Sequence, residues 1–390
     1  MRNFVNFSLT FVLLSACAMA EENKEVEFVP TKGDVYFTPI PIVAVNPTFG
    51  VLYGVAASVS GYVGNPKTTR MSTSLGTLTY STKNQLLATY KSNVYLEADA
   101  WVLLGDWRFF DTSQSTYGLG TGTFDDKFAN LNYKPSEEEQ NIEFKYVRFH
   151  ETAFKTIFPN GYVGVGYHFD KHYSIKEKLN PPTSHEQYSN TNGFSQDNYT
   201  SVGLSLNAMY DSRDNAANPY KGRYFLTTYR YNSEVLGSDS DASTLWLEYR
   251  DYFNLSGEEV PEHLLAIWTY GWFETSGETP YMDLPAVGWD QFGRSGRAYT
   301  QGRFRGNDVV YAEAEYRAHI WKWLGGVVFA NTTTASSKEA DIKLFDSNDY
   351  AYGTGLRFMI DKRARTNINL DVAWGKYGET AFYLNLNETF

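Results

Sequence analysis

The sequence predicts an all-β fold, a transmembrane antiparallel β-barrel, from its composition, its alternating strands and the sorting of its loops. Aromatic residues make up 17% of the 390 residues, with 30 Tyr and 26 Phe. Tyr, Phe and Thr fit the pleated surface of a sheet. The net charge of -11 argues against a nucleic-acid partner, because phosphate binding requires clustered Lys and Arg.

The N-terminus predicts export from the cytoplasm. In residues 1–20, Arg2 precedes an apolar stretch that ends in small residues at Ala20, as in a secretory signal peptide. We expect cleavage after Ala20; the alternative is lipidation at Cys17, because "LSAC" also resembles a bacterial lipobox. The sequence contains one Cys, so a disulfide within the chain is impossible.

The rest of the chain is expected to form one membrane domain without a membrane-spanning helix. After residue 20 no apolar run approaches the roughly 20 residues that such a helix needs. A closed barrel is the other architecture that satisfies every backbone group in lipid. We expect 21–35 to be a short periplasmic segment and 36–390 to be a barrel in the bacterial outer membrane.

Side chains alternate between apolar and polar along the candidate strands, as lipid-facing and lumen-facing positions of a barrel do. In "VVYAEAEYRAHI", Glu313, Glu315 and Arg317 share one parity, and apolar or small residues occupy the other. In "TNINLDVAWGK", Asp371 lies between Leu370 and Val372. We expect Glu313, Glu315, Arg317 and Asp371 to be lumenal charges.

We expect sixteen strands, near residues 36–45, 49–62, 70–81, 84–97, 99–111, 141–155, 161–174, 198–212, 221–233, 243–255, 263–276, 308–320, 324–335, 350–361, 365–377 and 380–390. The long connections, 112–140, 175–197, 277–307 and 336–349, all fall at one end of such a barrel. Short periplasmic turns and long external loops are typical of outer-membrane barrels. A soluble β-sandwich, the alternative for an alternating pattern, gives no reason for this sorting.

The final stretch, "AFYLNLNETF", places Phe382, Leu384, Leu386 and the terminal Phe390 on one parity. A terminal aromatic strand of this kind resembles the sorting signal that the outer-membrane assembly machinery reads, which makes that machinery an expected partner. The alternative is the last edge strand of a soluble protein. Such an apolar edge would invite aggregation.

Four stretches resemble the barrel module of the outer membrane protein 85 superfamily, in particular its short members without periplasmic POTRA domains. They are "PIVAVNPTFGVLYGVAAS", "YDSRDNAANPYKGRYF", "GRAYTQGRFRGNDVVYAEAEYR" and "GTGLRF" with the terminal strand. The resemblance implies sixteen strands and a long sixth loop, here 277–307, folded into the lumen. It also implies that an Arg-Gly-aromatic tip docks on an inward Asp of a Phe-x-Asp-x-Gly strand.

The best match to this tip is Arg297-Ala298-Tyr299, with Arg305 as the alternative. The matching strand carries Asn331 where the family has Asp, so an Arg-carboxylate pair is unavailable at that position. Three inward carboxylates are alternative partners for Arg297: Glu313, Glu315 and Asp371.

"YDSRDNAANPYKGRYF" concentrates charge, as a metal site or a catalytic cluster would, but it lies between two strands. Pro and Gly at 219 and 222 favour a turn. We expect a structural clasp at the periplasmic rim in which the polar side chains pair with each other and with backbone amides. Its residues are Asp211, Arg213, Asp214, Asn215, Pro219 and Gly222.

The sharpest metal candidate is "GYHFDKH", in which His168, Asp170 and His172 share one face of a strand. Imidazole and carboxylate suit zinc, but a barrel places polar side chains on that face without any ligand. We therefore predict no metal and no cofactor. The sequence also lacks a Gly-x-Ser-x-Gly motif, and we predict that the protein is not an enzyme.

Two functions follow from these expectations. The first is envelope biogenesis or lipid and protein handling, in which a weak seam between the first and last strands perturbs the bilayer or passes lipid or protein segments. The alternative is a passive pore for small solutes, partly plugged by the sixth loop. Outer-membrane lipids are expected partners, and polar loops or a lipid-facing seam can each support a homodimer.

The barrel is expected to require detergent for extraction and to shift on a gel when heated, because a closed, fully hydrogen-bonded sheet unfolds only at high temperature. Electrophoresis of heated and unheated samples measures this shift. A freely soluble protein with a single, heat-insensitive band would contradict the barrel.

Overall fold

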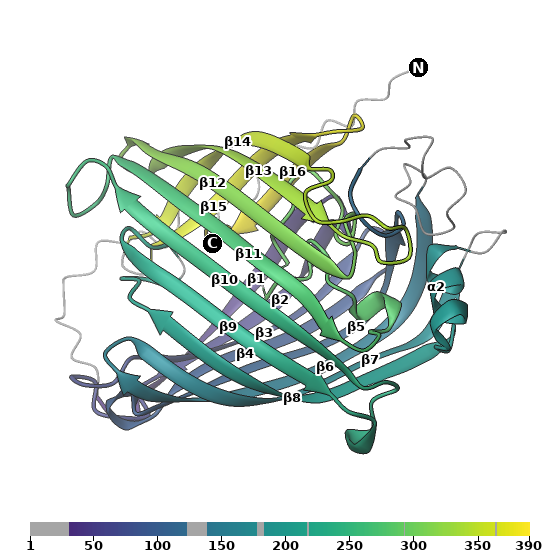
Figure 1. Ribbon diagram of the computed structural model, residues 1–390. Helices are drawn as coiled ribbons and strands as arrows, with labels where there is room; N and C mark the ends of the chain where they lie inside the picture. The colour runs from purple at the N-terminus through teal and green to yellow at the C-terminus, as the bar shows by residue number, and fades with distance from the viewer. Residues whose placement is uncertain (1–30, 123–138, 178–182, 217, 292, 363–364) are drawn as a thin grey trace.

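The computed structural model describes residues 31–122, 139–177, 183–216, 218–291, 293–362 and 365–390. The chain forms a closed barrel of sixteen antiparallel strands, in which each strand pairs with its neighbours in sequence. Figure 1 shows the strands tilted around the barrel, with the C-terminus inside its outline. The predicted fold class and strand number are confirmed.

The strands are β1 (Val35–Asn46), β2 (Gly50–Gly61), β3 (Ser72–Ser81), β4 (Leu86–Tyr95), β5 (Trp101–Thr116), β6 (Gln140–Phe158), β7 (Gly161–Glu177), β8 (Asn198–Asp211), β9 (Gly222–Asn232), β10 (Ala242–Asn254), β11 (His263–Ser276), β12 (Asp308–Trp321), β13 (Leu324–Ala335), β14 (Asp349–Asp361), β15 (Thr366–Gly375) and β16 (Thr380–Leu386).

Burial along the strands follows the division between an outer face and a lumen. In β8, Leu204 and Leu206 are 56% and 66% exposed, whereas Ser205 and Asn207 beside them are buried. An outer face that meets hydrocarbon must be apolar, while the lumen accepts polar groups. The two-residue period of a strand therefore produces both faces from one segment.

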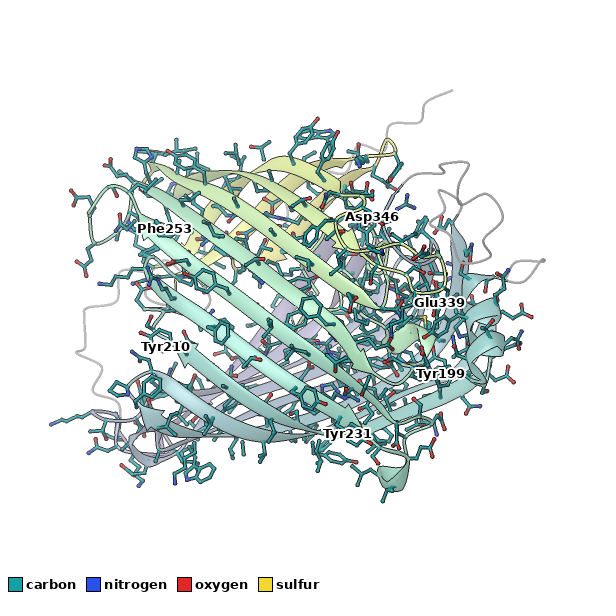
Figure 2. The ribbon with its side chains drawn as sticks, viewed as in Figure 1. Tyr199, Tyr210, Tyr231, Phe253, Glu339 and Asp346 are labelled. Carbon is teal, nitrogen blue, oxygen red and sulfur yellow. The ribbon has the colours of Figure 1, made fainter. Side chains whose placement is uncertain are left out.

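Aromatic side chains lie on the outer face near both ends of the barrel. Tyr210 and Phe253 lie toward one end and Tyr231 toward the other, as Figure 2 shows, and all three are exposed. Aromatic girdles at both ends are typical of barrels whose rings sit at the two membrane interfaces.

The loops separate into a short-turn end and a long-loop end, as the sequence predicts. The connection between β7 and β8 also contains α2 (Ser184–Asn192), which strand alternation does not reveal. The Thr183 side chain caps α2 by accepting a hydrogen bond from the Glu186 amide, and Gly193 ends it with a φ of 75°. No helix in the described residues is long and apolar enough to cross a membrane.

The C-terminal strand differs from its prediction. β16 ends at Leu386, short of the predicted strand 380–390, and residues 387–390, called here the C-terminal tail, turn into the lumen. Phe390 is 3% exposed and does not continue the outward row of Phe382. The predicted signal peptide, Cys17 and most of the 21–35 segment lie outside the described residues.

The seam between β1 and β16 is the weakest joint of the sheet. In the described residues these strands align at one residue pair, Val45 opposite Leu384. β15 and β16, in contrast, align from Ile368 to Trp374. Residues 35–44 of β1 pair with β2 on one side, and no ladder partner in β16 is described on the other.

Candidate functional site

Loop six, residues 277–307 between β11 and β12, contacts the lumenal face of the barrel through Arg297. The Arg297 side chain is buried, and its guanidinium donates to the carboxylates of Glu313 and Glu315 on β12. It also donates to Asp371 Oδ2 on β15 at 3.2 Å. The guanidinium carbon lies 3.4 Å from the centre of the Phe329 ring, which adds a cation-π contact. One cation thus joins loop six to three strands.

Asn331, the position where the family pattern has Asp, contacts Arg297 differently. Its side-chain amide donates to the Arg297 backbone carbonyl at 3.2 Å, not to the guanidinium. The loop is therefore anchored to β13 through its backbone, while the charge is neutralised by carboxylates of β12 and β15. This division explains how the chain holds loop six without the usual Asp.

The two residues after Arg297 complete the docking. Ala298 adopts a φ of 98°, a conformation that favours Gly, at the position where the resembling family has Gly. The Tyr299 hydroxyl donates to the Tyr350 carbonyl at 2.6 Å and accepts from the Lys376 amide at 2.9 Å. A Cβ at Gly375 would lie 2.7 Å from the Tyr299 ring, so the absence of a side chain there permits this approach.

The lumenal charge cluster consists of Arg297, Arg317, Arg357, Glu313, Glu315, Asp371 and Glu388, all buried. Arg317 Nε donates to Glu315 at 2.6 Å, and Arg357 donates to Asp371 at 2.5 Å and to Glu388 at 2.7 Å. Three guanidinium groups thus face four carboxylates. Buried charges persist only when paired in this way, because removing either sign leaves the other desolvated and unpaired.

The C-terminal tail is held by the same cluster and by loop six. Phe390 packs 5.3 Å from the Trp268 ring, and its carbonyl accepts from Arg317 at 3.0 Å. From loop six, Arg294 donates to the backbone carbonyls of Leu386 at 2.8 Å, of Asn387 at 3.3 Å and of Glu388. These contacts draw the last residues away from β1 and into the barrel.

Arg305, the alternative latch residue, has another role. Its guanidinium donates to the carbonyls of Tyr281 at 2.9 Å and Leu284 at 3.4 Å, within loop six itself. Arg305 therefore stabilises the conformation of loop six through hydrogen bonds within the loop. Arg297 makes the contacts to the strands.

The rim cluster is a turn between β8 and β9. Arg213 donates two hydrogen bonds of 2.9 Å to Asp211, and the Asn215 side chain accepts from the Asn218 amide at 2.9 Å. Gly222 has a φ of 102°, and a Cβ there would lie 2.3 Å from the Ser212 carbonyl oxygen. The geometry is that of a structural clasp.

A second turn, which sequence reasoning did not connect with it, completes this clasp. Asp214 accepts from the amides of Tyr220 and Lys221 and from Arg365 at 2.7 Å. Partial burial favours a higher pKa for the Asp214 carboxyl, but the Arg365 guanidinium and the two amides outweigh it and hold the pKa below its ordinary value. The two turns therefore act as one rim structure.

The histidine stretch on β7 places Asp170, and not a metal-binding group, at the centre of a lumenal network. Asp170 accepts hydrogen bonds from Tyr146, Arg148, His150 and Arg230 at 2.5 to 3.0 Å. His172 does not contact Asp170 in this way; its Nδ1 lies 3.3 Å from Oδ1 of Asp283 in loop six. Within the described ranges, no group of His, Cys, Asp or Glu side chains is arranged to hold a metal ion.

Three residues of this site escape the sequence prediction. Arg357 shares the inward parity of β14, so alternation was a signal for it within "GTGLRF". Glu388 and Arg294 carry no such signal, because neither lies in a strand. The two-residue alternation assigns side chains to the lumen or the outer face only within a strand, so it says nothing about residues beyond the strand's end.

The sequence matches the model of the Omp85 superfamily domain over residues 61–390. The chain belongs to the Omp85 superfamily. Two solved structures share the fold of this Omp85 barrel: BamA from Haemophilus ducreyi lacking POTRA domains 1-3, with 15% identity and a TM-score of 0.58, and CdiB from Acinetobacter baumannii, with 12% identity and a TM-score of 0.53.

The alignment with BamA covers 92% of this chain and 70% of that one, and the alignment with CdiB covers 91% and 65%. At these identities the likeness shows the fold alone. A search of curated proteins finds no significant match.

Replacing Arg297 with Met is expected to destabilise the folded barrel by about 3–5 kcal/mol, because Glu313, Glu315 and Asp371 would lose a shared buried cation. The temperature of the heat-induced gel shift and protease cleavage within loop six measure the loss. Lys32→Met is the matched control, since it removes an ion pair with Glu97 that is exposed to solvent and therefore contributes little to stability. Equal behaviour of the two variants would contradict the docking role.

Proposed function

We propose that this Omp85-superfamily barrel lies in the bacterial outer membrane and acts in envelope biogenesis through its seam, where it perturbs the bilayer or passes lipid or protein segments. The observation that carries the proposal is that β1 and β16 align at one pair in the described residues, Val45 opposite Leu384. The other neighbouring strands align over long ladders, for example from Trp101 to Thr116 in β5.

The physical reason lies in the backbone. A buried N–H or C=O group without a partner costs several kcal/mol in hydrocarbon, where no water replaces the lost bond. The edge of β1 along residues 35–44 lacks a described ladder in β16, while Val35 and Phe37 expose 69% and 65% of their surface. Lipid beside this edge must rearrange to reduce the cost, which makes the seam the site of membrane perturbation.

The same proposal assigns no catalysis to the protein. Ser205 and His168 share a hydrogen bond of 2.7 Å in the lumen, the first step toward an activated nucleophile. However, His168 Nδ1 has no hydrogen-bond partner in the described part of the chain, so the group that orients such a histidine in hydrolases is missing.

A disulfide across the seam tests the function. Val45→Cys with Leu384→Cys places two thiols at the aligned pair, and oxidation is expected to abolish the envelope role by preventing separation of β1 and β16. Entry of a dye that an intact outer membrane excludes, with and without reductant, measures that role in cells.

The matched control is Val372→Cys with Phe382→Cys, which bridges the continuous ladder of β15 and β16. This control is expected to leave function unchanged. Normal function in oxidised cells with the seam disulfide would overturn the proposal.

The passive pore is the second candidate, because a cavity of about 290 Å³ lies beside loop six in the lumen. If loop six plugs a pore, deletion of 280–305 should raise conductance in planar bilayers, since the Arg297 side chain and its loop would leave the lumen. Lys32→Met serves as the unaltered control. A barrel that assembles but does not conduct after the deletion would overturn the pore function.

A further inference from the structure

The lumenal cavity beside loop six reaches the seam from within. Thr77, Thr89 and Lys91 of β3 and β4 form one wall, and Asn46 of β1 and Tyr383 of β16 contribute from the two seam strands. A volume of about 290 Å³ is enough for a small polar group, such as a lipid headgroup, but not for a folded segment. The cavity therefore lies where a molecule entering between β1 and β16 would arrive.

Three basic side chains that line this cavity, Lys91, Arg108 and Arg294, donate to backbone carbonyls. Lys91 Nζ donates to the Gln291 carbonyl of loop six, and Arg108 Nη2 donates to the same oxygen at 2.9 Å. Arg294, also in the wall, donates to three carbonyls at the end of the chain. An anionic oxygen in place of these carbonyls would form stronger, charge-assisted hydrogen bonds.

Acids close to the cavity balance part of this charge. Asp106 accepts two hydrogen bonds from Arg108, and Asp290 accepts from the Arg294 amide. Asp371, which lines the cavity itself, binds Arg297 and Arg357 of the lumenal charge cluster. The donors of Lys91, Arg108 and Arg294 that bond backbone carbonyls are the groups that an incoming anion would engage.

The edge of β1 distinguishes lipid from polypeptide as the entering molecule. If the register of Val45 and Leu384 continued, Pro41 would face Glu388 and Pro39 would face Phe390. Proline has no N–H to donate, and it occurs in strands where that side of the backbone has no partner. β1 therefore cannot offer an added strand a complete ladder, which agrees with the inward turn of the C-terminal tail.

We propose that the seam admits a phosphate-bearing lipid, whose headgroup enters the cavity and binds Lys91, Arg108 and Arg294 in place of backbone carbonyls. The acyl chains remain against the exposed apolar face of β1, where Val43 is 52% exposed. This proposal rests on the envelope function and names its substrate class: a phospholipid, not a polypeptide strand.

Binding of phosphatidylglycerol to the purified full chain tests the headgroup site. Native mass spectrometry compares its retention with that of diacylglycerol, which has the same chains without phosphate. Wild-type protein is expected to retain phosphatidylglycerol selectively, and inorganic phosphate is expected to compete. Lys91→Met with Arg294→Gln should weaken binding about tenfold or more, because charge-assisted bonds are lost.

Lys32→Met, which removes an exposed cation at Glu97, controls for headgroup binding at the surface and should bind as wild type does. The heat-induced gel shift verifies folding, and Lys91→Arg, which keeps the charge, should retain binding. Unchanged binding by the double variant overturns the site. Binding of inorganic phosphate without phosphatidylglycerol overturns the lipid assignment.

A cross-linking experiment tests exclusion of strands. Thr389 would face Ile40 in the continued register, so Ile40→Cys should not cross-link to an added synthetic peptide of residues 381–390 with Cys in place of Thr389. Adding Pro39→Val and Pro41→Val restores two N–H groups and is expected to permit the cross-link. Efficient capture by the variant that keeps both prolines would overturn the lipid assignment in favour of a polypeptide strand.

These results are separable from the test of the envelope function. If the seam disulfide abolishes the envelope role but the protein does not bind phosphatidylglycerol, only the lipid proposal is overturned. If the protein binds phosphatidylglycerol but the seam disulfide has no effect on function, the envelope function is overturned and the headgroup site remains.

Discussion

The structure depends on one buried cation, Arg297, and the carboxylates around it. Glu313 and Glu315 lie on β12 and Asp371 lies on β15, and these buried carboxylates require cationic partners in the lumen. Loop six supplies Arg297, which joins Arg317 and Arg357 of the strands in pairing with them. The need to neutralise these acids therefore fixes the loop against the wall and reduces the open space of the lumen.

The same charge network reaches the seam. Asp371 also pairs with Arg357, and Arg357 pairs with Glu388 of the C-terminal tail, so the residues after β16 are held inside the barrel. A tail held there cannot extend the ladder along β1. The weak seam thus follows from a strong ionic interaction elsewhere, and the prolines of β1 are compatible with the resulting unpaired edge.

This chain has Asn331 where the family pattern has Asp, and the docking of loop six is consistent with that difference. Asn331 cannot neutralise Arg297, and the structure uses it to hold the loop backbone. Carboxylates of β12 and β15 provide the charge that Asn331 lacks. The docking of loop six is therefore preserved by a different set of partners, because lumenal strands offer several inward positions within reach of one long guanidinium.

The sequence by itself determined the strand number, the face of each strand and the end at which each loop lies, because alternation and turn composition are local properties. It also placed Glu313, Glu315, Arg317 and Asp371 in the lumen. Only the tertiary structure decided which acids meet Arg297, why Arg305 does not replace it, and where Phe390 lies. Those outcomes depend on closure of the barrel, which brings loop six, β15 and the C-terminal tail together across the lumen. The alternation of apolar and polar residues along single strands does not encode these long-range contacts.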